Sequence, residues 1–326
     1  MFSVADLRHD LIDRARTMAK LRTPNHPWQQ MTDTELLRSA ALILTDTSTG
    51  REGITLAAIL LFGPDNLILS ALAHHKTDAI FRVFNTDRYD DRDVIITNLL
   101  ESHDRMVAFG KKHLNDLFVT EGMQSISARD KILREIVSNS LAHRDYSNAY
   151  VAKLVIEKDR ILTENSNRPH GFGNLNPSSF EPFPKNPPIS KVFREIGLAD
   201  ELGSGMRNTF KYTKLYSGAE PTFIEGDVFR IIVPLSEAAV ATVGPSKVPK
   251  SHDDTLDDTL DDTLELRILS LINMNPRINQ HKLSQQLDVS LPTIKRAMSG
   301  MVEKGVLERN GGKRYGHWVI KAGRAL

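Results

Sequence analysis

The segment between residues 236 and 264 constrains this chain most, because it separates parts that cannot share one hydrophobic core. From Ser236 to Lys250 the composition changes to Ala, Val, Pro and Ser, which is typical of a linker. Asp-Asp-Thr-Leu then repeats three times, ending at Leu256, Leu260 and Leu264. The four-residue period would place these leucines on one stripe of a helix, and a solvated acidic tether is the alternative. We therefore expect separate domains on the two sides of a linker over residues 237–263.

The last part of the chain, residues 264–326, has the pattern of three helices followed by a hairpin. Helices are expected over Leu264–Ile272 and Asn279–Leu287, and a third after Ser290, whose residue type caps helix N-termini. The third helix has an apolar stripe at core-facing spacing, formed by Ile294, Ala297, Met298, Met301 and Val302. Asn310-Gly311-Gly312 separates two strand-like segments, Val306–Arg309 and Tyr315–Ile320, which predicts the hairpin.

This C-terminal part is basic, although the whole chain has a net charge of only +1. Residues 264–326 hold eleven Lys or Arg against four Asp or Glu, and Asp253–Asp262 before them holds six aspartates. A basic segment beside an acidic one leads to a hypothesis. The aspartates would imitate phosphate and fold back on the basic residues until a signal releases them.

Three helices and a basic hairpin resemble the winged helix-turn-helix modules of bacterial transcription factors. In that family the third helix enters the major groove of DNA and the wing contacts the backbone or minor groove. The resemblance implies double-stranded DNA as a partner, with contacts through Thr293, Lys295, Arg296, Arg309, Lys313 and Arg314. The alternative is a winged helix that binds protein or forms a homo-oligomer.

In the middle of the chain, a helix expected over Ala128–His143 has three polar residues at four-residue spacing, namely Glu135, Asn139 and His143. Steps of four rotate by only about 40° around a helix, so these side chains form one polar stripe. A carboxylate one turn from an asparagine suits ATP hydrolysis, because the carboxylate can orient water and the amide oxygen can coordinate Mg²⁺. The alternative is a helix with a satisfied polar edge.

Three motifs, including one on this helix, occur in the order found in one family. The segment from Arg134 to Ser147 resembles the first motif of GHKL-like ATPase domains, and more narrowly that of bacterial RecG-like putative transcriptional regulators. An Asn-Pro step before a helix, Asn186-Pro187, and a glycine turn, Gly203-Ser204-Gly205, are similar to the later motifs. The resemblance covers about residues 50 to 235, and it implies a two-layer α/β sandwich that binds ATP and Mg²⁺.

The same resemblance implies roles for individual residues. Glu135 would be the general base, and Asn139 would bind Mg²⁺ and the nucleotide. The nucleotide would also contact His143, Asn165, Gly203, Ser204 and Gly205, with glycine N–H groups directed at phosphate from a helix N-terminus. Between Thr163 and Gly173 the chain lacks the Asp-x-Gly-x-Gly segment whose aspartate binds adenine, and Glu164 or Asn165 would substitute. The domain is therefore called degenerate, and at most weak ATP hydrolysis is expected.

The remaining segments predict a fold of the α+β class. Helices are expected over Asp6–Lys20, Thr32–Ile43, Asp91–Leu117 and Ile189–Ile196, and from Gly205. Strands are expected at Ala79–Phe84, Tyr150–Ile156, Arg160–Glu164 and Phe229–Val233, with a 24-residue loop over Asn165–Pro188. The expected domains are a mixed α/β scaffold at 1–118, the GHKL-like domain at 119–236, the linker at 237–263 and the winged helix at 264–326.

Several classes of protein are excluded or disfavoured. The chain has no cysteine, so disulfides, thiolate zinc sites and cysteine nucleophiles are excluded. The N-terminus does not have a signal peptide pattern, and the apolar stretch Leu56–Phe62 is too short to span a membrane, so a cytoplasmic protein is expected. A helicase motor needs a Gly-x-x-x-x-Gly-Lys-Ser/Thr loop, which is absent. The N-terminal AlbA-like (Schlafen-type) domain of relatives is not recognisable either, so a shortened form is expected.

The most favoured function is a DNA-binding transcriptional regulator, in which the middle domain senses a nucleotide or mediates oligomerisation. The first alternative is a Mg²⁺-dependent ATPase that acts on or with DNA. The second is an interaction scaffold that binds neither nucleotide nor DNA.

Overall fold

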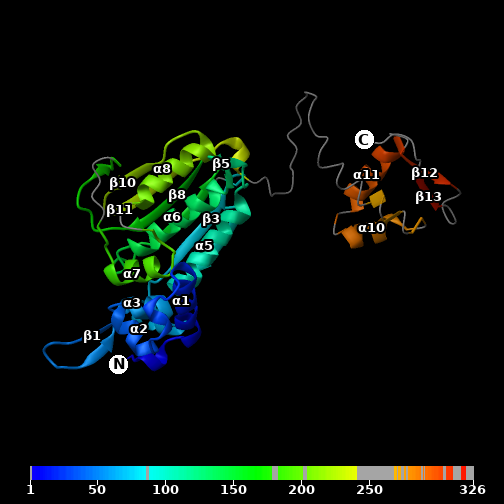
Figure 1. Cartoon of the computed structure of the whole chain (residues 1–326). Coiled ribbons are helices and arrows are strands. Elements are labelled where there is room, and N and C mark those ends of the chain that lie inside the picture. Colours follow the sequence, from blue (N-terminus) through cyan, green and yellow to red (C-terminus); the bar gives the residue numbers. More distant parts are fainter. Residues whose placement is uncertain are drawn as a thin grey trace. The chain divides into compact units, whose positions relative to one another are not determined.

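The computed structural model describes residues 2–85, 88–177, 183–200, 204–240 and, in the C-terminal part, 268–320 without 270, 273–274, 277, 288, 290, 304–305 and 311–316. The chain forms a first unit, Met1–Pro245, and a second unit, Ser246–Leu326, and each is described by itself (Figure 1). The first unit has a central mixed sheet covered by helices, and the second has the helix–helix–hairpin order of a winged helix. The fold class predicted from the sequence is therefore confirmed.

A seven-stranded sheet is the centre of the first unit, in the order β4-β3-β7-β8-β11-β10-β9. Its strands are β3 (Thr77–Arg82), β4 (Asp91–Ile95), β7 (Ala152–Glu157), β8 (Arg160–Ser166), β9 (Gly173–Asn174), β10 (Thr222–Glu225) and β11 (Val228–Pro234). The pair β3–β7 is parallel, and the other neighbouring pairs are antiparallel. The predicted hairpin is the pair β7–β8, in which Ile156 lies opposite Ile161.

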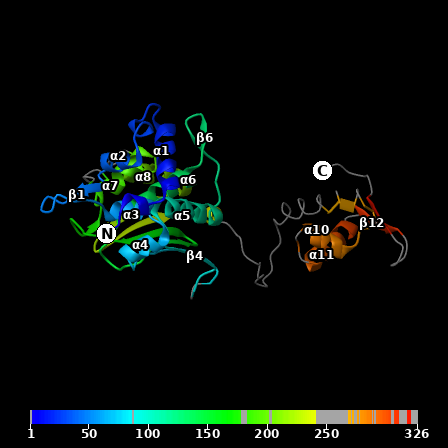
Figure 2. The same ribbon diagram turned by 90° about the horizontal axis from the view of Figure 1, so that it is seen from below.

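Three helices pack on one face of this sheet, namely α5 (Leu99–His113), α6 (Ala128–Ala142) and α8 (Ser204–Ser217). Helix α6 lies between the other two, and Figure 2 shows the same layering in a second view. Gly110 allows α5 and α6 to approach closely, because a Cβ atom there would lie 2.4 Å from a Cδ atom of Leu133. The sheet and these helices form the two-layer sandwich that positions the site described below.

The opposite face of the sheet carries cross-strand ion pairs. Glu164 on β8 accepts from Arg230 on β11 at 2.8 Å and lies 3.4 Å from Lys153 on β7. Further pairs join neighbouring strands at Arg82–Glu157 and Arg92–Asp78. Successive residues of a strand point to opposite faces, so the same strands supply apolar side chains to the helices and charged side chains to the other side.

A helical region precedes the sheet and packs into the same core. Its elements are η1 (Val4–Asp6), α1 (His9–Arg22), η2 (Pro27–Gln29), α2 (Asp33–Ser39), β1 (Ile43–Thr45), β2 (Glu52–Ile54), α3 (Leu56–Phe62) and α4 (Asp65–Ala71). Thr32 and Glu35 form the capping box that the sequence predicts at the start of α2. Five of the seven residues of α3, Ala58 to Phe62, are buried, as expected from the apolar sequence. None of the described helices is long and apolar enough to cross a membrane.

The structure differs from the boundary expected at residue 118. Strands β3 and β4 lie before that position, yet β3 pairs in parallel with β7, for example at Ala79 and Leu154. Strands before and after residue 118 thus share one sheet, and the hydrogen bonds between β3 and β7 would be lost if the chain were divided between α5 and α6.

Two local predictions need correction. The helix expected over Asp91–Leu117 begins only at Leu99, because residues 91–95 form β4 and pair with β3. The long loop over Asn165–Pro188 contains β9, which pairs with β10, and its residues 178–182 lie outside the described residues. Two small hairpins were not predicted from the sequence. One is β1–β2, and the other pairs β5 (Val119–Glu121) with β6 (Gln124–Ile126). A last short helix, η3 (Glu237–Ala239), ends the described part of the first unit.

The second unit contains α10 (Gln280–Leu287), α11 (Leu291–Glu303), β12 (Leu307–Asn310) and β13 (His317–Ile320). Its buried core includes four residues of the predicted stripe, namely Ile294, Ala297, Met298 and Met301. Val302 is 44% exposed, so its assignment to the stripe was wrong. Ile268 and Ile272, from the segment expected to be the first helix, are buried in the same core. The acidic repeats and the expected cap Ser290 lie outside the described residues.

Candidate functional site

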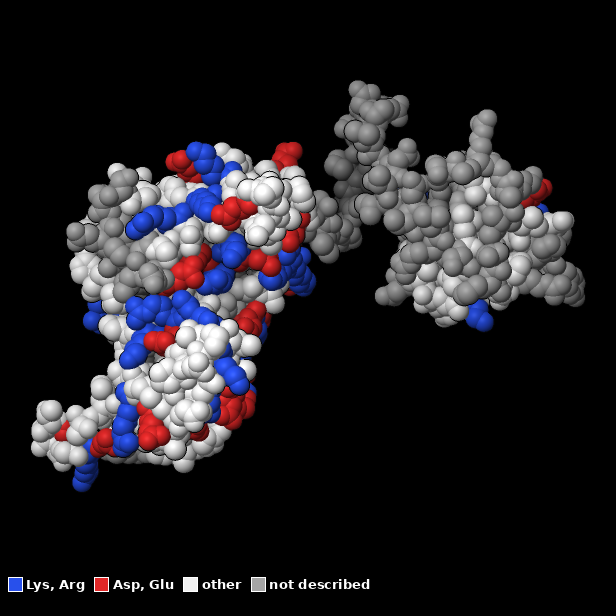
Figure 3. Space-filling view, in the orientation of Figure 1, with Lys and Arg blue, Asp and Glu red and all other residues white. Residues whose placement is uncertain are grey.

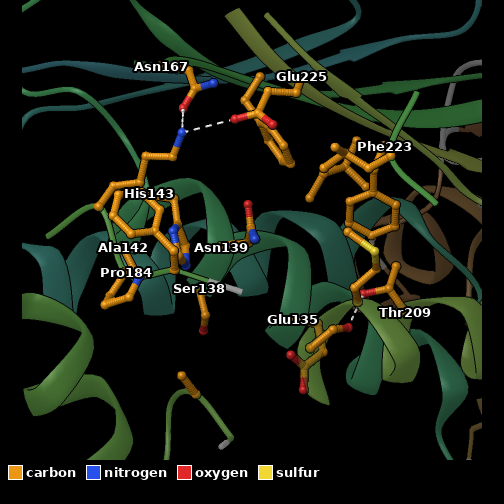
Figure 4. Close-up of a pocket in the computed structure, with 18 of the residues that line it drawn as sticks. Glu135, Ser138, Asn139, Ala142, His143, Asn167, Pro184, Thr209, Phe223 and Glu225 are labelled. Atoms are coloured by element: carbon orange, nitrogen blue, oxygen red, sulfur yellow. Dashed lines mark hydrogen bonds and ion pairs between the residues drawn. The ribbon is translucent and has the colours of Figure 1, made fainter. Parts of the chain in front are cut away.

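A cavity of about 730 Å³ lies between α6 and the sheet (Figure 4). This volume is in the range of pockets that bind nucleotides and other small molecules. Its walls come from α6, from β10 and β11, from α7 (Pro187–Glu195), from the N-terminus of α8 and from the loop between β8 and α7. The sheet contributes the apolar side chains of Phe223, Phe229 and Ile231, and polar groups at its edge from Asn174 and Glu225. The other polar side chains come mainly from the helices and the loop.

The polar stripe of α6 faces this cavity. Glu135, Asn139 and His143 all line it, together with Ser138 and Ala142 from the same helix. Figure 4 shows these side chains along one side of α6, with Phe223 and Glu225 across the cavity from them. The four-residue spacing thus brings a carboxylate, an amide and an imidazole into one site, as the sequence predicts.

Glu135 is the acidic group at one end of the stripe. Burial raises the pKa of its carboxyl group above the ordinary value, and the nearby charge of Asp200 raises it further. Asn208 Nδ2 donates to Glu135 Oε1 at 3.4 Å, and the side of Gly205 lies directly against Oε2. A Cβ atom at position 205 would be 2.9 Å from that oxygen, so only glycine leaves Glu135 this position. The glycine turn therefore shapes the acidic end of the cavity.

Asn139 has a buried side-chain oxygen, Oδ1, that accepts no hydrogen bond within the described part of the chain. A buried acceptor without a partner carries a free-energy cost of about 1–3 kcal/mol, which a ligand donor or a cation could offset. A neutral amide oxygen is also a ligand that Mg²⁺ accepts when phosphate oxygens and water fill its other positions. Asn139 thus fits the role of a Mg²⁺ ligand, although the described residues contain no cluster of three His, Asp or Glu that would hold a metal alone.

The other end of the cavity is closed by an ion pair. Lys185 Nζ donates to Asn167 Oδ1 at 2.5 Å, to the Arg168 carbonyl at 2.6 Å and to Glu225 Oε1 at 3.2 Å. Lys185 and Glu225 are only 15% and 10% exposed. His143 lies nearby, and burial, followed by the charge of Lys185, lowers its pKa to about 4. The imidazole is therefore neutral at physiological pH and can offer one donor and one acceptor to a ligand.

The Asn-Pro motif has a structural role beside the cavity. Asn186 Nδ2 donates to the carbonyl oxygens of Ala142 and Arg144 at 2.9 and 2.8 Å, at the C-terminal end of α6. Pro187 follows in the first turn of α7, where a missing N–H costs nothing. This motif holds the end of α6, and with it His143, against the loop that closes the cavity.

Three expected nucleotide contacts, Asn165, Glu164 and Ser204, are not among the residues that line the cavity. Asn165 is buried on β8, where its amide donates to the Ser166 carbonyl at 3.1 Å. Glu164, the other substitute for the adenine-binding aspartate, pairs with Arg230 on the far face of the sheet. Asn167 lines the cavity in their place. Of the glycine turn, Gly205 lines the cavity, Ser204 begins α8, and Gly203 lies outside the described residues.

Sequence reasoning also missed three charged residues of the cavity, namely Lys185, Arg194 and Glu225. Lys185 immediately precedes the recognised Asn-Pro motif, so its position was a usable signal. Glu225 and Arg194 lie outside any motif, and only the folding of the chain brings them to α6. The three residues add one negatively charged and two positively charged side chains to the site.

In the second unit, two of the expected DNA contacts, Lys295 and Arg296, are exposed on α11, opposite its buried stripe. Thr293 is half-buried on the same helix. Arg309 on β12 is exposed, and its guanidinium lies 5.2 Å from the centre of the Trp318 ring. Lys313 and Arg314 lie outside the described residues. The described residues thus place basic groups on the third helix and on the first strand of the wing.

Comparison with known proteins supports the assignment of the second unit as a winged helix. Residues 261–308 match a family described as winged helix-turn-helix DNA-binding, which confirms the C-terminal winged helix predicted from the sequence. Residues 1–78 match a domain of unknown function, DUF8451. No curated protein matches the chain.

One solved structure similar to this chain is that of the DIP2311 protein from Corynebacterium diphtheriae. The two agree with a TM-score of 0.51 at 16% sequence identity, over 98% of this chain and 63% of that one. At this identity the likeness concerns the fold alone. This chain therefore spans somewhat less than two thirds of the length of that protein.

Proposed function

We propose that this protein is a DNA-binding transcriptional regulator whose first unit binds a nucleotide. The observation that carries the DNA-binding part is the winged helix match together with exposed Lys295 and Arg296 on the third helix. A helix in the major groove needs such groups to contact phosphates and guanine edges. On the face of the first unit seen in Figure 3, basic and acidic residues are interspersed, which favours the second unit as the DNA-binding surface. A regulator of this kind would act in the cytoplasm.

DNA binding can be tested with the double variant Lys295→Ala/Arg296→Ala in the full chain. We expect weaker binding to genomic DNA fragments, and a salt dependence whose slope falls by about 1 for each phosphate contact removed. Lys20→Ala/Lys214→Ala is the matched control, because it removes the same charge from exposed positions on α1 and α8 of the first unit. If both double variants bind DNA as the unaltered protein does, a winged helix that binds protein becomes the better explanation.

The nucleotide-binding part rests on the cavity. A mixed sheet with three helices on one face, an acid–amide stripe and a glycine at the start of α8 support a GHKL-like domain of the RecG-like type. In this proposal Asn139 would hold Mg²⁺, which supplies positive charge to the phosphates when bound. The chain lacks the aspartate that binds adenine in GHKL ATPases, so the part of the site that would hold the adenine base differs from theirs. The proposed ligand is ATP, bound without that aspartate.

Calorimetry with ATP and ADP, with and without Mg²⁺, tests this proposal on the full chain. We expect binding that Mg²⁺ strengthens, and in Asn139→Leu a loss of that strengthening, because the variant cannot ligate the ion. Ser190→Ala, a small change in another lining residue, is the control. Absence of nucleotide binding by the unaltered protein would leave the cavity without this function and would favour the scaffold alternative.

The second candidate is ATP hydrolysis, which is favoured by the buried carboxylate of Glu135. A raised pKa makes this group a stronger base once it is ionised, and its position one turn from Asn139 suits the orientation of a water molecule. Steady-state phosphate release should fall in Glu135→Ala at unchanged nucleotide affinity. Equal rates in both proteins would reject catalysis and leave binding alone.

A further inference from the structure

We propose that Arg194 anchors a phosphate group of the ligand in the cavity of the first unit, so that the site selects a nucleoside polyphosphate over the free nucleoside. The proposal deepens the proposed function, because it rests on the cavity binding a nucleotide. The charged groups that line the cavity differ in whether a ligand can reach them without breaking an existing contact.

Most charged groups around the cavity already have partners in the protein. Asp200 Oδ1 accepts from Arg134 Nη2 at 2.6 Å. Glu225 pairs with Lys185 at 3.2 Å, and the same ammonium group donates to two further oxygens, so its three donors are engaged. Phosphate could displace Lys185 only by leaving the buried Glu225 carboxylate without its cationic partner, with the His170 N–H as its remaining donor. Lys185 is therefore a closing group of the cavity and a poor phosphate ligand.

Arg194 differs from these groups. It lines the cavity, and within the described part of the chain no hydrogen bond or ion pair involves its guanidinium group. The contact that fixes Arg194 is made by its backbone carbonyl, which accepts from Arg22 Nη1 at 2.5 Å. A guanidinium group carries five donors in a planar fork that matches two oxygens of a phosphate. A half-buried arginine with no internal acceptor is a group to which an anionic ligand can bind at little cost.

The path of the chain places Arg194 at the phosphate end of the site. Helix α7 begins at the C-terminal end of α6, where Asn186 donates to Ala142 and Arg144, and the turn after α7 returns to Ser138, whose hydroxyl donates to the Leu198 carbonyl at 2.6 Å. Helix α7 therefore runs beside the second half of α6 in the opposite direction. Arg194, in its last turn, lies at the level of Ser138, about one helical turn from Glu135.

The N-terminus of α8 contributes to the same end of the cavity through Gly205. The dipole of this helix of 14 residues favours negative charge near its N-terminus. Arg194 supplies a full positive charge beside the partial positive charge of the helix N-terminus, and Asn139 supplies an oxygen for Mg²⁺. The phosphates of the ligand would thus lie toward the C-terminal end of α7 and the N-terminus of α8. The base would lie toward His143 and Lys185.

The experiment compares the affinities of the full chain for ADP, AMP and adenosine by calorimetry, for the unaltered protein and for Arg194→Gln. Hydrogen bonds to charged groups correspond to about ten- to a hundredfold in affinity, so ADP should bind more tightly than adenosine by at least that factor. In Arg194→Gln this preference should fall by about tenfold or more, while adenosine binding is unchanged. Arg194→Lys keeps the charge without the planar fork and should keep part of the preference.

Arg207→Gln is the matched control, since it removes one arginine from an exposed position on α8 that does not line the cavity. It should keep the preference for ADP, and a loss there would point to the net charge and overturn the role of Arg194. An unchanged preference in Arg194→Gln overturns the assignment of Arg194 while the nucleotide site stands. If the unaltered protein binds ADP no better than adenosine, the phosphate anchor is wrong. If it binds neither, the proposed nucleotide binding fails as well. Should Arg194→Gln fail to fold, Arg194→Lys alone decides between these outcomes.

Discussion

His103 gives the first unit a specific sensitivity to acid. Its ring is 5% exposed on α5, at the edge of the Phe193 ring, and within the described structure both ring nitrogens lack a hydrogen-bond partner. Burial lowers the pKa of the imidazole to about 4, and the positive charges of Arg134 and Arg14 act in the same direction. The ring is therefore buried in its neutral form, and each unpartnered nitrogen reduces the stability of the folded state.

The size of the effect follows from the two pKa values. In the unfolded chain the ring binds a proton below about pH 6.5, whereas in the folded protein it does so only below about pH 4. Between these values the unfolded state holds more protons, so the free energy of unfolding falls as the pH is lowered. From pH 7 to pH 5 the loss from this one group amounts to about 2 kcal/mol.

The variant His103→Leu removes this term, because leucine has a similar size and no titratable or polar atom. Urea unfolding can be followed by the fluorescence of Trp28 in a Trp318→Phe background, since Trp28 and Trp318 are the two tryptophans and Trp28 is buried in the first unit. We expect the loss of stability between pH 7 and pH 5 to be about 2 kcal/mol smaller in the variant. At pH 7 the variant should be at least as stable as its parent. An equal pH dependence in both proteins would refute the reasoning, whatever their absolute stabilities.

Three further predictions concern packing, the closure of the cavity and the acidic segment. Gly110→Ala should lower the stability by about 1–2 kcal/mol in urea unfolding despite the better helix propensity of alanine, because its Cβ overlaps Leu133; a gain would contradict the close packing of α5 and α6. Lys185→Met leaves Glu225 buried and unpaired and should cost about 3 kcal/mol, of which Lys185→Met/Glu225→Gln should recover more than half; equal losses in single and double variants would show that the pair does not hold the loop. Replacing the six aspartates of Asp253–Asp262 by asparagine should raise DNA affinity at low salt in gel-shift titrations, and no change would refute the phosphate-mimic hypothesis.

The parts of the fold that the sequence predicted well have strong local signals. Helix α6 and the third helix of the winged module are long and have clear apolar stripes, so their bounds were close to those observed. Strand β4 was taken for the start of a helix because Asp91, Arg92 and Asp93 have little strand character, and its conformation depends on pairing with β3. The same holds for β9, whose two residues are extended because they pair with β10. Short elements defined by their neighbours give little local signal.

The residues of the candidate site likewise fall into those with a local sequence signal and those without one. Glu135, Asn139 and His143 were predicted together because one helix spaces them, and a period is visible in a single segment. Glu225 and Arg194 come from elements that are distant in sequence, and no spacing rule connects them to α6. Asn167 was not predicted, because it lines the cavity from the position just after the end of β8 at Ser166, and the exact end of a strand has little local signal.

The recognised motifs themselves concern structure as much as chemistry. Asn186 and Pro187 hold the C-terminal end of α6 and begin α7, and Gly205 gives Glu135 the space it occupies. Such residues maintain the shape of the cavity whatever binds in it. Within the described part of the chain, the Asn139 oxygen, the neutral imidazole of His143 and the guanidinium of Arg194 remain available to a ligand in the cavity. Substitution of these three groups should therefore distinguish a cavity that binds a nucleotide from one that does not.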